Sequence, residues 1–523
     1  MSGVRDCMIV AGALGLAGCA LGLGGCAVGP SYHTPDVHVP AHYAPVPAAG
    51  SAPANSGAST APAASIDLAT WWRALRDPEL ESLVDRAVKA NPDVLIALDR
   101  LQAARTFEIA VLGSALPDAE ASAGAGRGTG SDLARGRASQ SLVAADNASA
   151  VHHINVLAGF DSLWEIDLFG KYRREIQAVR ADAQASAAQR NAVLVSVIAD
   201  VARAYVDLRG LQVRAAVVHD AIAALQETLR IVNLRYERGI TNELDVTLAA
   251  RELATLQSQV APLDAAASAA QYTIATLLGQ YPETLVAELT PVRMIPSVPG
   301  RVDGGMPVDL LRRRPEVLQA ERQLAAATAR IGVATANLFP QIGVTGAIGF
   351  QQQGFGTTPQ VGQHVWSLGP AALWPLLDFG ALDAQVEAAD LQTRALLVNY
   401  RRTVQNAVKE VDTNWRAFTA QQDRLSRLGE ALTASQRAVT LANERYRRGL
   451  TDFLNVVDAQ RQEYDIEGQY ADAQVSAAEQ FIALYRSFGG GWQNYQKLPA
   501  PHFPEPAVVA AFHRVLSRSD PLK

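Results

Sequence analysis

The sequence predicts a mainly α-helical chain with a smaller transmembrane β part, arranged as two successive copies of one unit. Three observations predict this class. Two long stretches, 118–261 and 376–498, contain no proline and are rich in residues that favour helix. Shorter segments alternate apolar and polar residues, which is typical of half-buried strands. A twelve-residue phrase occurs twice, as RYERGITNELDV from Arg235 and RYRRGLTDFLNV from Arg445.

The chain begins with a segment built like an export signal, in which Arg5 precedes an apolar run of small residues. Two boxes, LAGC ending at Cys19 and LGGC ending at Cys26, are typical of bacterial lipoprotein signals. We favour Cys26 as the lipidated residue, which makes 1–25 the signal peptide, with Cys19 as the alternative. A retained transmembrane helix is the other interpretation. Residues 26–65, rich in Pro, Ala and Ser, are expected to form a lipidated, extended N-terminal segment.

Composition argues against several classes of function. All three cysteines lie within the first 26 of the 523 residues, so the rest of the chain can have no disulfide framework and no cysteine metal site. A formal net charge of −6 is too small to predict nucleic acid as a partner. The histidines are scattered, and GAGRGTG from Gly124 lacks the context of a phosphate-binding loop. We therefore expect no catalytic residue, metal or cofactor, and a protein that is not an enzyme.

The longest expected helix covers residues 171–238 and would extend about 100 Å at 1.5 Å per residue. A helix of this length must pack beside others to bury its apolar stripe. Sequence similarity between the two copies runs through the helices and defines a repeat. The copies are expected to span 66–290 and 305–495, and a tail, 496–523, follows.

The offset between the copies changes once. NPDVLIALDRLQAA from Asn91 aligns with RPEVLQAERQLAAA from Arg314, an offset of 223 residues (314 − 91). WEIDLFG from Trp164 aligns with WPLLDFG from Trp374, an offset of 210 residues (374 − 164). The change marks a loop of variable length. Because apolar residues alternate on both sides of it, each copy is expected to contribute one β-hairpin, at about 118–164 and 341–375.

Four strands of about ten residues, with an apolar face and a tryptophan at one end, match outer-membrane barrel strands. Four strands cannot close a barrel, so an open sheet in lipid would leave unpaired edges. Chains in a membrane would therefore associate in a ring with cyclic symmetry. The alternative for these hairpins is a sheet packed on the helices of a soluble protein.

Several motifs give the chain a family resemblance, and they extend from Cys26 to about Tyr495. It resembles the TolC-like outer-membrane efflux ducts, in the lipoprotein branch that works with resistance-nodulation-division pumps, the NodT-type group. The motifs are CAVGPSY, WWRALRDPEL, WEIDLFG, the two RY phrases, LLRRRPEVLQAERQLAAATARIGVATANLFP, LNVVDAQR and FGGGW.

The resemblance implies an architecture and a function. Three chains would form a homotrimer with a twelve-stranded β-barrel in the outer membrane and a long α-helical barrel across the periplasm. The implied partners are outer-membrane lipid, a periplasmic membrane-fusion adaptor protein and an inner-membrane resistance-nodulation-division transporter. The implied function is a passive duct that exports drugs or other small toxic compounds in a tripartite efflux pump.

The repeated phrase is expected to form a helical hairpin turn. Gly239 and Gly449 end the long helices, and Thr241 and Thr451 are candidate N-caps of the returning helices. The resemblance places both turns at the periplasmic tip, which contacts the adaptor. The alternative is that the phrase is only turn chemistry with a stacked Arg-Tyr pair. The tip residues are Arg235, Tyr236, Gly239, Asp245, Arg445, Tyr446 and Gly449.

The resemblance also implies a periplasmic gate formed by Leu454, Asn455 and Asp458. Leu454 and Asp458 are four residues apart and share a helix face. Around a threefold axis, Asp458 would form a carboxylate ring of the kind that filters cations, with Leu454 as an apolar constriction. Asn455 occupies the position at which some relatives carry a second acidic residue. In the first copy, the equivalent position is occupied by an acid, Asp245. The alternative for Asp458 is a local ion pair with Arg461.

Two other functions compete with the duct. A lipid-anchored, non-conducting coiled-coil rod would serve as a structural or interaction protein of the outer membrane, without barrel strands. A general porin is the second competitor, but the long proline-free helices have no role in a porin.

Overall fold

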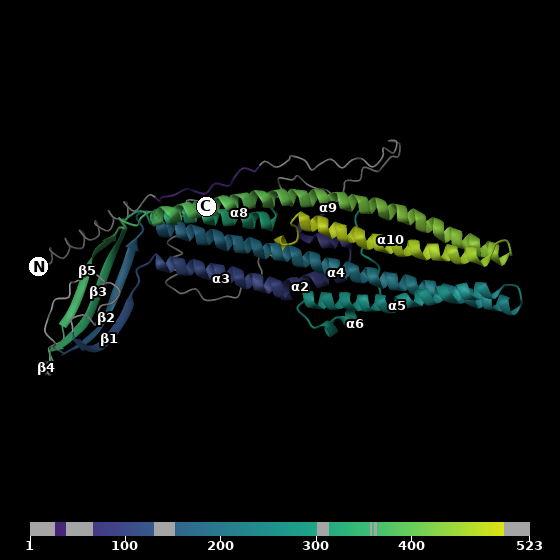
Figure 1. Ribbon diagram of the computed structural model, residues 1–523, viewed down its shortest axis with the longest axis horizontal. Coiled ribbons are helices and arrows are strands. Elements are labelled where there is room, and N and C mark those ends of the chain that lie inside the picture. The colour runs from purple at the N-terminus through teal and green to yellow at the C-terminus, as the bar shows by residue number, and fades with distance from the viewer. Residues whose placement is uncertain are drawn as a thin grey trace, which may run out of the picture.

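The computed structural model describes residues 27–37, 66–129, 152–300, 313–355, 358–359 and 363–495. The molecule is elongated, with a β-sheet at one end and two helical hairpin tips at the other (Figure 1). In chain order the elements are η1 (Leu68–Leu75), α2 (Pro78–Ala90), α3 (Pro92–Ser114), β1 (Glu120–Thr129), β2 (His152–Ile166), α4 (Lys171–Glu237), α5 (Glu243–Leu277), η3 (Pro282–Thr284), α6 (Val286–Leu289), α8 (Pro315–Ala336), β3 (Gln341–Phe355), β4 (Thr358–Pro359), β5 (Gln363–Leu373), α9 (Ala381–Arg447), α10 (Phe453–Ser487) and η4 (Gln493–Tyr495).

The helices occur as two sets of the same lengths. Helices α4 and α9 each have 67 residues, and α5 and α10 each have 35. Their first residues differ by the same 210 positions (381 − 171 = 453 − 243). Helix α4 agrees to within one residue with the helix predicted over 171–238. It would extend about 100 Å, which makes the molecule long.

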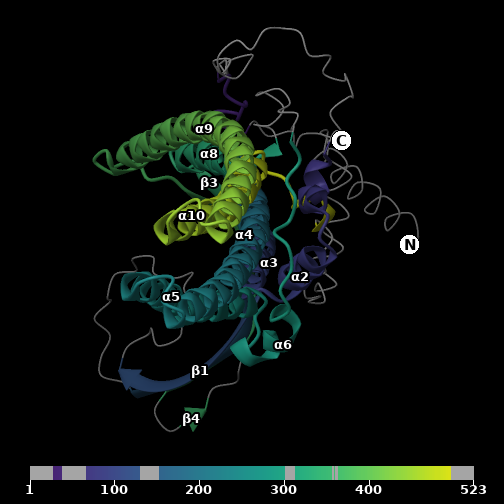
Figure 2. The same cartoon turned by 90° about the vertical axis from the view of Figure 1, so that its right-hand side faces the viewer.

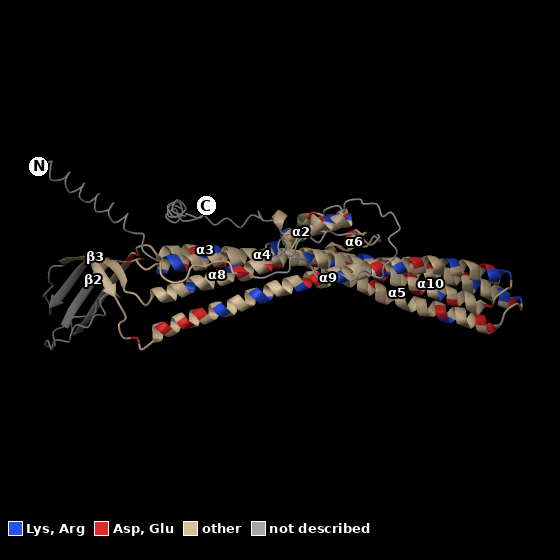
Figure 3. Cartoon of the chain, turned by 90° about the horizontal axis from the view of Figure 1, so that it is seen from above, with Lys and Arg blue, Asp and Glu red and all other residues tan. Residues whose placement is uncertain are grey.

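Four helices form a row next to the sheet. Helix α4 packs between α3 and α8, and α8 packs between α4 and α9 (Figure 1). Helices α3 and α9 therefore lie at the two sides of this row. Toward the other end, α5 returns along α4 and α10 returns along α9. Figure 3 shows that charged residues of both signs are spread along the α5 and α10 end.

The main hydrophobic core lies midway along the molecule, where η1 and α2 pack against α4 and the end of α10. Trp71 stacks on Tyr485 with ring centroids 5.9 Å apart, and Phe481 lies 4.6 Å from Tyr485. The WWRALRDPEL motif therefore supplies core residues. It also supplies Asp77, whose carboxylate caps α2 by accepting hydrogen bonds from the N–H groups of Glu79 and Leu80.

A buried ion pair joins this core to the segment that follows α5. Arg209 of α4 is 0% exposed and donates to Glu79 of α2 at 2.7 Å. It also donates to Gln212 at 2.6 Å and to the carbonyl of Pro291 at 2.8 Å. These bonds from its two terminal nitrogens offset the cost of burying the guanidinium, while among the described residues its Nε is buried without a hydrogen-bond partner. Arg209 thus connects α2, α4 and the segment that follows α5.

The sheet is antiparallel, with the long strands in the order β1, β2, β3, β5. The two hairpins lie where the alternating residues predict strands. The sequence predicts four strands and the structure has a fifth, because Thr358–Pro359 pairs with the end of β3. Most of the predicted variable tips lie outside the described residues.

One face of the sheet carries a row of large apolar side chains. Phe160 pairs with Ile348, and Ile348 pairs with Trp366 in the neighbouring strand. All three are exposed in the single chain, with Trp366 at 77%. Exposure of such a row to water is unfavourable, so this face is suited to contact with lipid or another apolar surface. In the part of the chain that the structure describes, the helices include none with the length and hydropathy needed to span a membrane.

Candidate functional site at the helical hairpin tips

Both copies of the repeated phrase form the same turn. Gly239 has φ +66° and Gly449 has φ +71°, a region that favours glycine. The N–H of Ile240 donates to the carbonyl of Arg235 at 2.9 Å, and the N–H of Gly239 donates to that of Tyr236 at 2.9 Å. These two bonds define a Schellman motif, which satisfies the carbonyls at the end of α4.

The turn after α9 repeats this geometry. The N–H of Leu450 donates to the carbonyl of Arg445 at 2.9 Å, and Gly449 donates to Tyr446 at 3.0 Å. The basic and aromatic residues of each phrase therefore supply the carbonyls that close the turn. Any side-chain role of these residues is additional to this backbone role.

The predicted N-caps are wrong by one residue. Asn242, not Thr241, caps α5 and accepts a hydrogen bond from the N–H of Asp245 at 3.1 Å. Asp452, not Thr451, occupies the N-cap position of α10. The threonines instead bond four residues ahead.

Each threonine contacts the position at which the two copies differ in charge, which is Asp245 in the first copy and Asn455 in the second. The hydroxyl of Thr241 donates to the carboxylate of Asp245. In the second copy the Asn455 amide donates to the hydroxyl of Thr451 at 2.9 Å. Asp245 and Asn455 are thus held in equivalent places, but only the first copy presents a charge there.

The two hairpins meet in a small apolar cluster near their tips, formed by Val232, Ala249, Tyr446, Phe453, Val456 and Val457. Figure 2 views the molecule from the tip end and shows the α4–α5 hairpin beside the α9–α10 hairpin. Burial raises the pKa of Tyr446, as expected for a phenol removed from water.

An arginine of one hairpin stacks on a tyrosine of the other. The Arg235 guanidinium lies 4.5 Å from the centre of the Tyr446 ring. Tyr446 is 9% exposed, whereas its equivalent Tyr236 is 45% exposed. Arg445 is also exposed. The structure therefore brings Arg235 and Tyr446 together across the two hairpins and leaves Tyr236 and Arg445 on the surface of the single chain.

The three predicted gate residues lie on one exposed face of α10. Leu454, Asn455 and Asp458 are exposed, because Phe453, Val456 and Val457 occupy the buried face. Asp458 forms an ion pair with Arg461 at 3.3 Å, the local contact named above as the alternative to a gate. Both side chains are about half exposed, and such a pair contributes only a few tenths of a kcal/mol. Asp458 is therefore only weakly held in this position.

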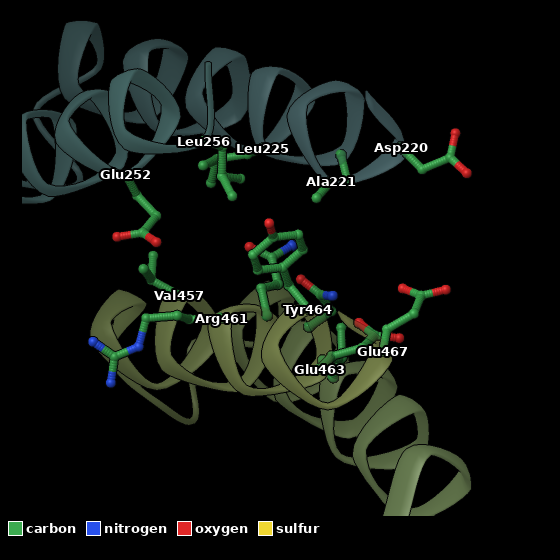
Figure 4. Close-up of a pocket in the computed structure, with 14 residues that line it drawn as sticks. Asp220, Ala221, Leu225, Glu252, Leu256, Val457, Arg461, Glu463, Tyr464 and Glu467 are labelled. Atoms are coloured by element: carbon green, nitrogen blue, oxygen red, sulfur yellow. The ribbon is translucent and has the colours of Figure 1, made fainter. Parts of the chain in front are cut away.

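An acidic cavity of about 330 Å³ separates the two hairpins behind the tip cluster. Figure 4 shows Asp220 on α4 and Glu463 and Glu467 on α10 at this cavity. Burial raises the pKa of Glu463, and burial together with the charges of Glu463 and Asp220 raises the pKa of Glu467. Sequence reasoning missed this cavity, although two glutamates four residues apart are a signal of like charges on one helix face.

A carboxyl pair, Asp207 of α4 and Glu479 of α10, lies near the main core. This pair predicts that the stability of the fold depends on pH. Burial, and then the neighbouring Glu479, raise the pKa of Asp207 to about 6. The folded chain therefore holds this proton more tightly than the unfolded chain. Stability is expected to fall by roughly 1 kcal/mol as the pH rises from about 4 to about 6, and then to level off.

Melting temperatures measured across this pH range test the expectation. Asp207→Asn keeps the shape and removes the charge, so its melting temperature should fall less than that of the wild type over this interval. Asp472→Asn is the control, since Asp472 lies on α10 in an exposed ion pair with Arg214. Equal pH dependence in the wild type and Asp207→Asn would contradict the assignment.

In the ranges that the structure describes, no three His, Cys, Asp or Glu side chains are grouped so as to hold a metal ion. Cys26, the predicted lipidation site, and the alternative Cys19 lie outside the described residues.

Comparisons with known proteins point in one direction. The family model described as outer membrane efflux protein matches residues 83–280 and 306–490. Nodulation protein T of Rhizobium leguminosarum bv. trifolii is 29% identical over 476 residues, covering 90% of this chain and 95% of that protein. The pyoverdine export outer membrane protein OpmQ of Pseudomonas aeruginosa is 27% identical, covering 82% of this chain and 88% of its own length.

The fold agrees with solved structures as well. The structure of the outer-membrane channel OprN is 34% identical and has a TM-score of 0.77, covering 90% of this chain and 100% of that one. These findings confirm the resemblance to TolC-like efflux ducts and the mainly helical fold with a small sheet. Because the family model spans well over half of its length, the chain belongs to the outer membrane efflux protein family.

Proposed function

We propose that this protein is the outer-membrane duct of a tripartite efflux pump. One observation carries the proposal: a sheet with an exposed apolar row lies at one end, and helices of 67 residues lead from it to paired tips. Such a molecule can occupy a membrane at one end and reach about 100 Å from it at the other. The names of its relatives, which include a solvent efflux pump outer membrane protein, support the same function.

The proposed assembly is a homotrimer. Strands β1 and β5 are the edges of the sheet in one chain, and an unpaired edge in lipid is very unfavourable. Three sheets joined edge to edge would give twelve long strands, and the helices would continue below as an α-helical barrel. This arrangement places Phe160, Ile348 and Trp366 toward lipid.

The proposed lipid anchor fits the position of the N-terminal segment. Ala27 packs against Gly170, at the junction between β2 and α4. Arg174 donates to the carbonyls of Val28 and Gly29 at 3.0 Å each, which fixes the segment there. A lipid attached to Cys26 would therefore enter the membrane beside the sheet, which favours Cys26 over Cys19.

The tips are proposed to contact a periplasmic adaptor, which links the duct to an inner-membrane resistance-nodulation-division transporter. The tips expose apolar side chains suited to such a contact, namely Ile240, Leu244 and Leu450. Asp458 and Leu454 are proposed to line the gate. There, Asp458 would leave its weak ion pair with Arg461 and bind the cations that pass. The protein carries out no reaction of its own, and the transporter supplies the energy.

Drugs or other small toxic compounds are the proposed cargo. Deleting the gene in the cell that makes this protein should raise retention of a fluorescent efflux dye, and the wild-type gene should restore export. Cys26→Ala is expected to restore export less well if the lipid anchors the duct. Unchanged dye retention in the deletion strain, with the pump's other components present, would favour the non-conducting rod.

A further inference from the structure

The described N-terminal segment, residues 27–37, lies along α8 and forms neither helix nor strand (Figure 1). We call this segment the strap. Gly29 lies against Gly332 near the sheet end of α8, and Val37 packs on a cluster that includes Val317 near the other end. Eight extended residues (37 − 29) cover about 26 Å, and fifteen helical residues (332 − 317) cover about 22 Å. The strap is therefore nearly extended and runs antiparallel to α8.

The end of the strap near the sheet is held by a buried arginine of α4. Arg174 is 6% exposed and donates to the carbonyls of Val28 and Gly29 at 3.0 Å each, and to Gln177 at 3.0 Å. Gly332 of α8 leaves room for this arginine, because a Cβ there would lie 2.8 Å from the Arg174 side chain. Release of the strap would take two acceptors from a buried guanidinium, which is unfavourable.

The middle of the strap is held by one carboxylate of α8. The hydroxyls of Tyr32 and Thr34 both donate to Oε1 of Glu321, at 3.1 and 3.2 Å. Burial, and then the charge of Glu321, raise the pKa of Tyr32 to about 12, so its hydroxyl remains a donor at neutral pH. The Tyr32 ring packs in the seam between α4 and α8, on a cluster that includes Ala181 and Ala326.

The far end of the strap reaches a third helix. Val37 packs on a cluster formed by α8 and α9, which includes Ala320 of α8 and Tyr400 and Val404 of α9. The strap thus contacts α4 in the first copy of the repeat and α8 and α9 in the second. A single short segment connects three neighbouring helices.

The groove that holds the strap is a feature of α8 and not of its counterpart α3. At the offset of 223 residues, Ile109 and Leu98 of α3 take the places of Gly332 and Glu321. An isoleucine would fill the opening that Gly332 leaves, and a leucine offers no acceptor for the two hydroxyls. The sequence of α8 therefore departs from that of α3 at the positions that the strap requires.

We propose that the strap is a clamp that joins α4, α8 and α9 into one rigid unit, so that the half of the molecule near the sheet keeps its shape when the helical tips move. The occupant of the groove on α8 is the strap of the same chain. Its contacts lie between the β2–α4 junction and the start of α8, whereas the hairpin tips lie at the other end of the molecule (Figure 1). The clamp acts within each chain and does not depend on the duct function.

Hydrogen exchange, measured by mass spectrometry on the purified protein in detergent, tests the clamp. Tyr32→Ala combined with Thr34→Ala removes the packed ring and both hydroxyls. Exchange in α8 and in the adjacent parts of α4 and α9 should rise on the order of 10-fold, because these helices open locally once the strap is released. Exchange in the tip segments, 235–246 and 445–456, should stay as in the wild type.

Two further variants support the interpretation of this experiment. His33→Ala is the matched control, because His33 is exposed and lies between the two replaced residues. It should exchange as the wild type does. Glu321→Leu removes the acceptor from the side of α8 and should give the same rise as the double variant. The equivalent residue of α3 is Leu98, so a leucine is compatible with a helix of this kind.

A combination with a tip variant tests whether the clamp separates the two halves. Tyr446→Ala removes the ring that packs between the hairpins, so exchange should rise at the tips and not in α8 while the strap is bound. When Tyr32→Ala and Thr34→Ala are added, exchange in α8 should rise by more than the product of the separate fold changes.

The results that would overturn the clamp are distinct from a failure of the duct. Exchange in α8 that stays unchanged after Tyr32→Ala with Thr34→Ala, or that rises equally with His33→Ala, would overturn it. An effect of Tyr446→Ala that reaches α8 while the strap is bound would overturn it as well. Neither result bears on ion conductance, which tests the duct separately.

Discussion

Arg209→Leu is expected to lower the free energy of unfolding by about 3–5 kcal/mol, because it removes one partner of a buried ion pair. Arg209 is fully buried and joins Glu79 to the carbonyls of the segment after α5. Without it, Glu79 would keep a hydrogen bond from the Tyr205 hydroxyl at 3.3 Å and the ion pair with Arg293, a side chain that is half exposed. Denaturant unfolding followed by circular dichroism measures the change.

Arg214→Leu is the matched control for this prediction. Arg214 lies on the same helix and forms an ion pair with Asp472 at 2.7 Å, but both side chains are well exposed. Its replacement should cost no more than about 1 kcal/mol. Equal losses in the two variants would show that Arg209 does not hold the core as described.

Tyr446→Ala is expected to loosen the tip, the second largest effect. The ring is buried against Phe453, with ring centres 5.6 Å apart, and it carries the Arg235 guanidinium. Removing a buried aromatic ring costs about 3 kcal/mol or more. Local opening at the tip, measured as the rate of trypsin cleavage at its arginines, should rise on the order of 100-fold.

Tyr446→Phe separates packing from hydrogen bonding in this experiment. Among the described residues, the Tyr446 hydroxyl is buried without a hydrogen-bond partner. The phenylalanine variant should therefore resist trypsin at least as well as the wild type. Rapid cleavage of Tyr446→Phe would mean that the hydroxyl, and not the ring, holds the hairpins together.

Local sequence signals predicted the helices and turns well. The absence of proline and the two glycines of the repeated phrase determine where α4 and α9 end, and both are local features. Apolar alternation likewise predicted the sheet, because side-chain direction in a strand depends only on position. The N-caps were wrong by one residue, since Thr and Asn, or Thr and Asp, are adjacent and both are suitable caps.

The contacts between hairpins could not be predicted from one copy of the phrase. Arg235 and Tyr446 are 211 positions apart (446 − 235), and only the packing of the two hairpins brings them together. Two such similar phrases also gave no reason to expect that Tyr446 is buried while Tyr236 is exposed. That difference arises because each copy has a different neighbour in the folded chain.

Single-channel conductance in a planar lipid bilayer is the most direct test of the duct, with wild type compared with Asp458→Ala. We expect a small, cation-preferring conductance in the wild type, because in the proposed trimer six hairpins would close the tip and three Asp458 carboxylates would line it. Asp458→Ala should raise the conductance or abolish the cation preference. No conductance from well-inserted trimers of either form would contradict the duct and favour a non-conducting rod.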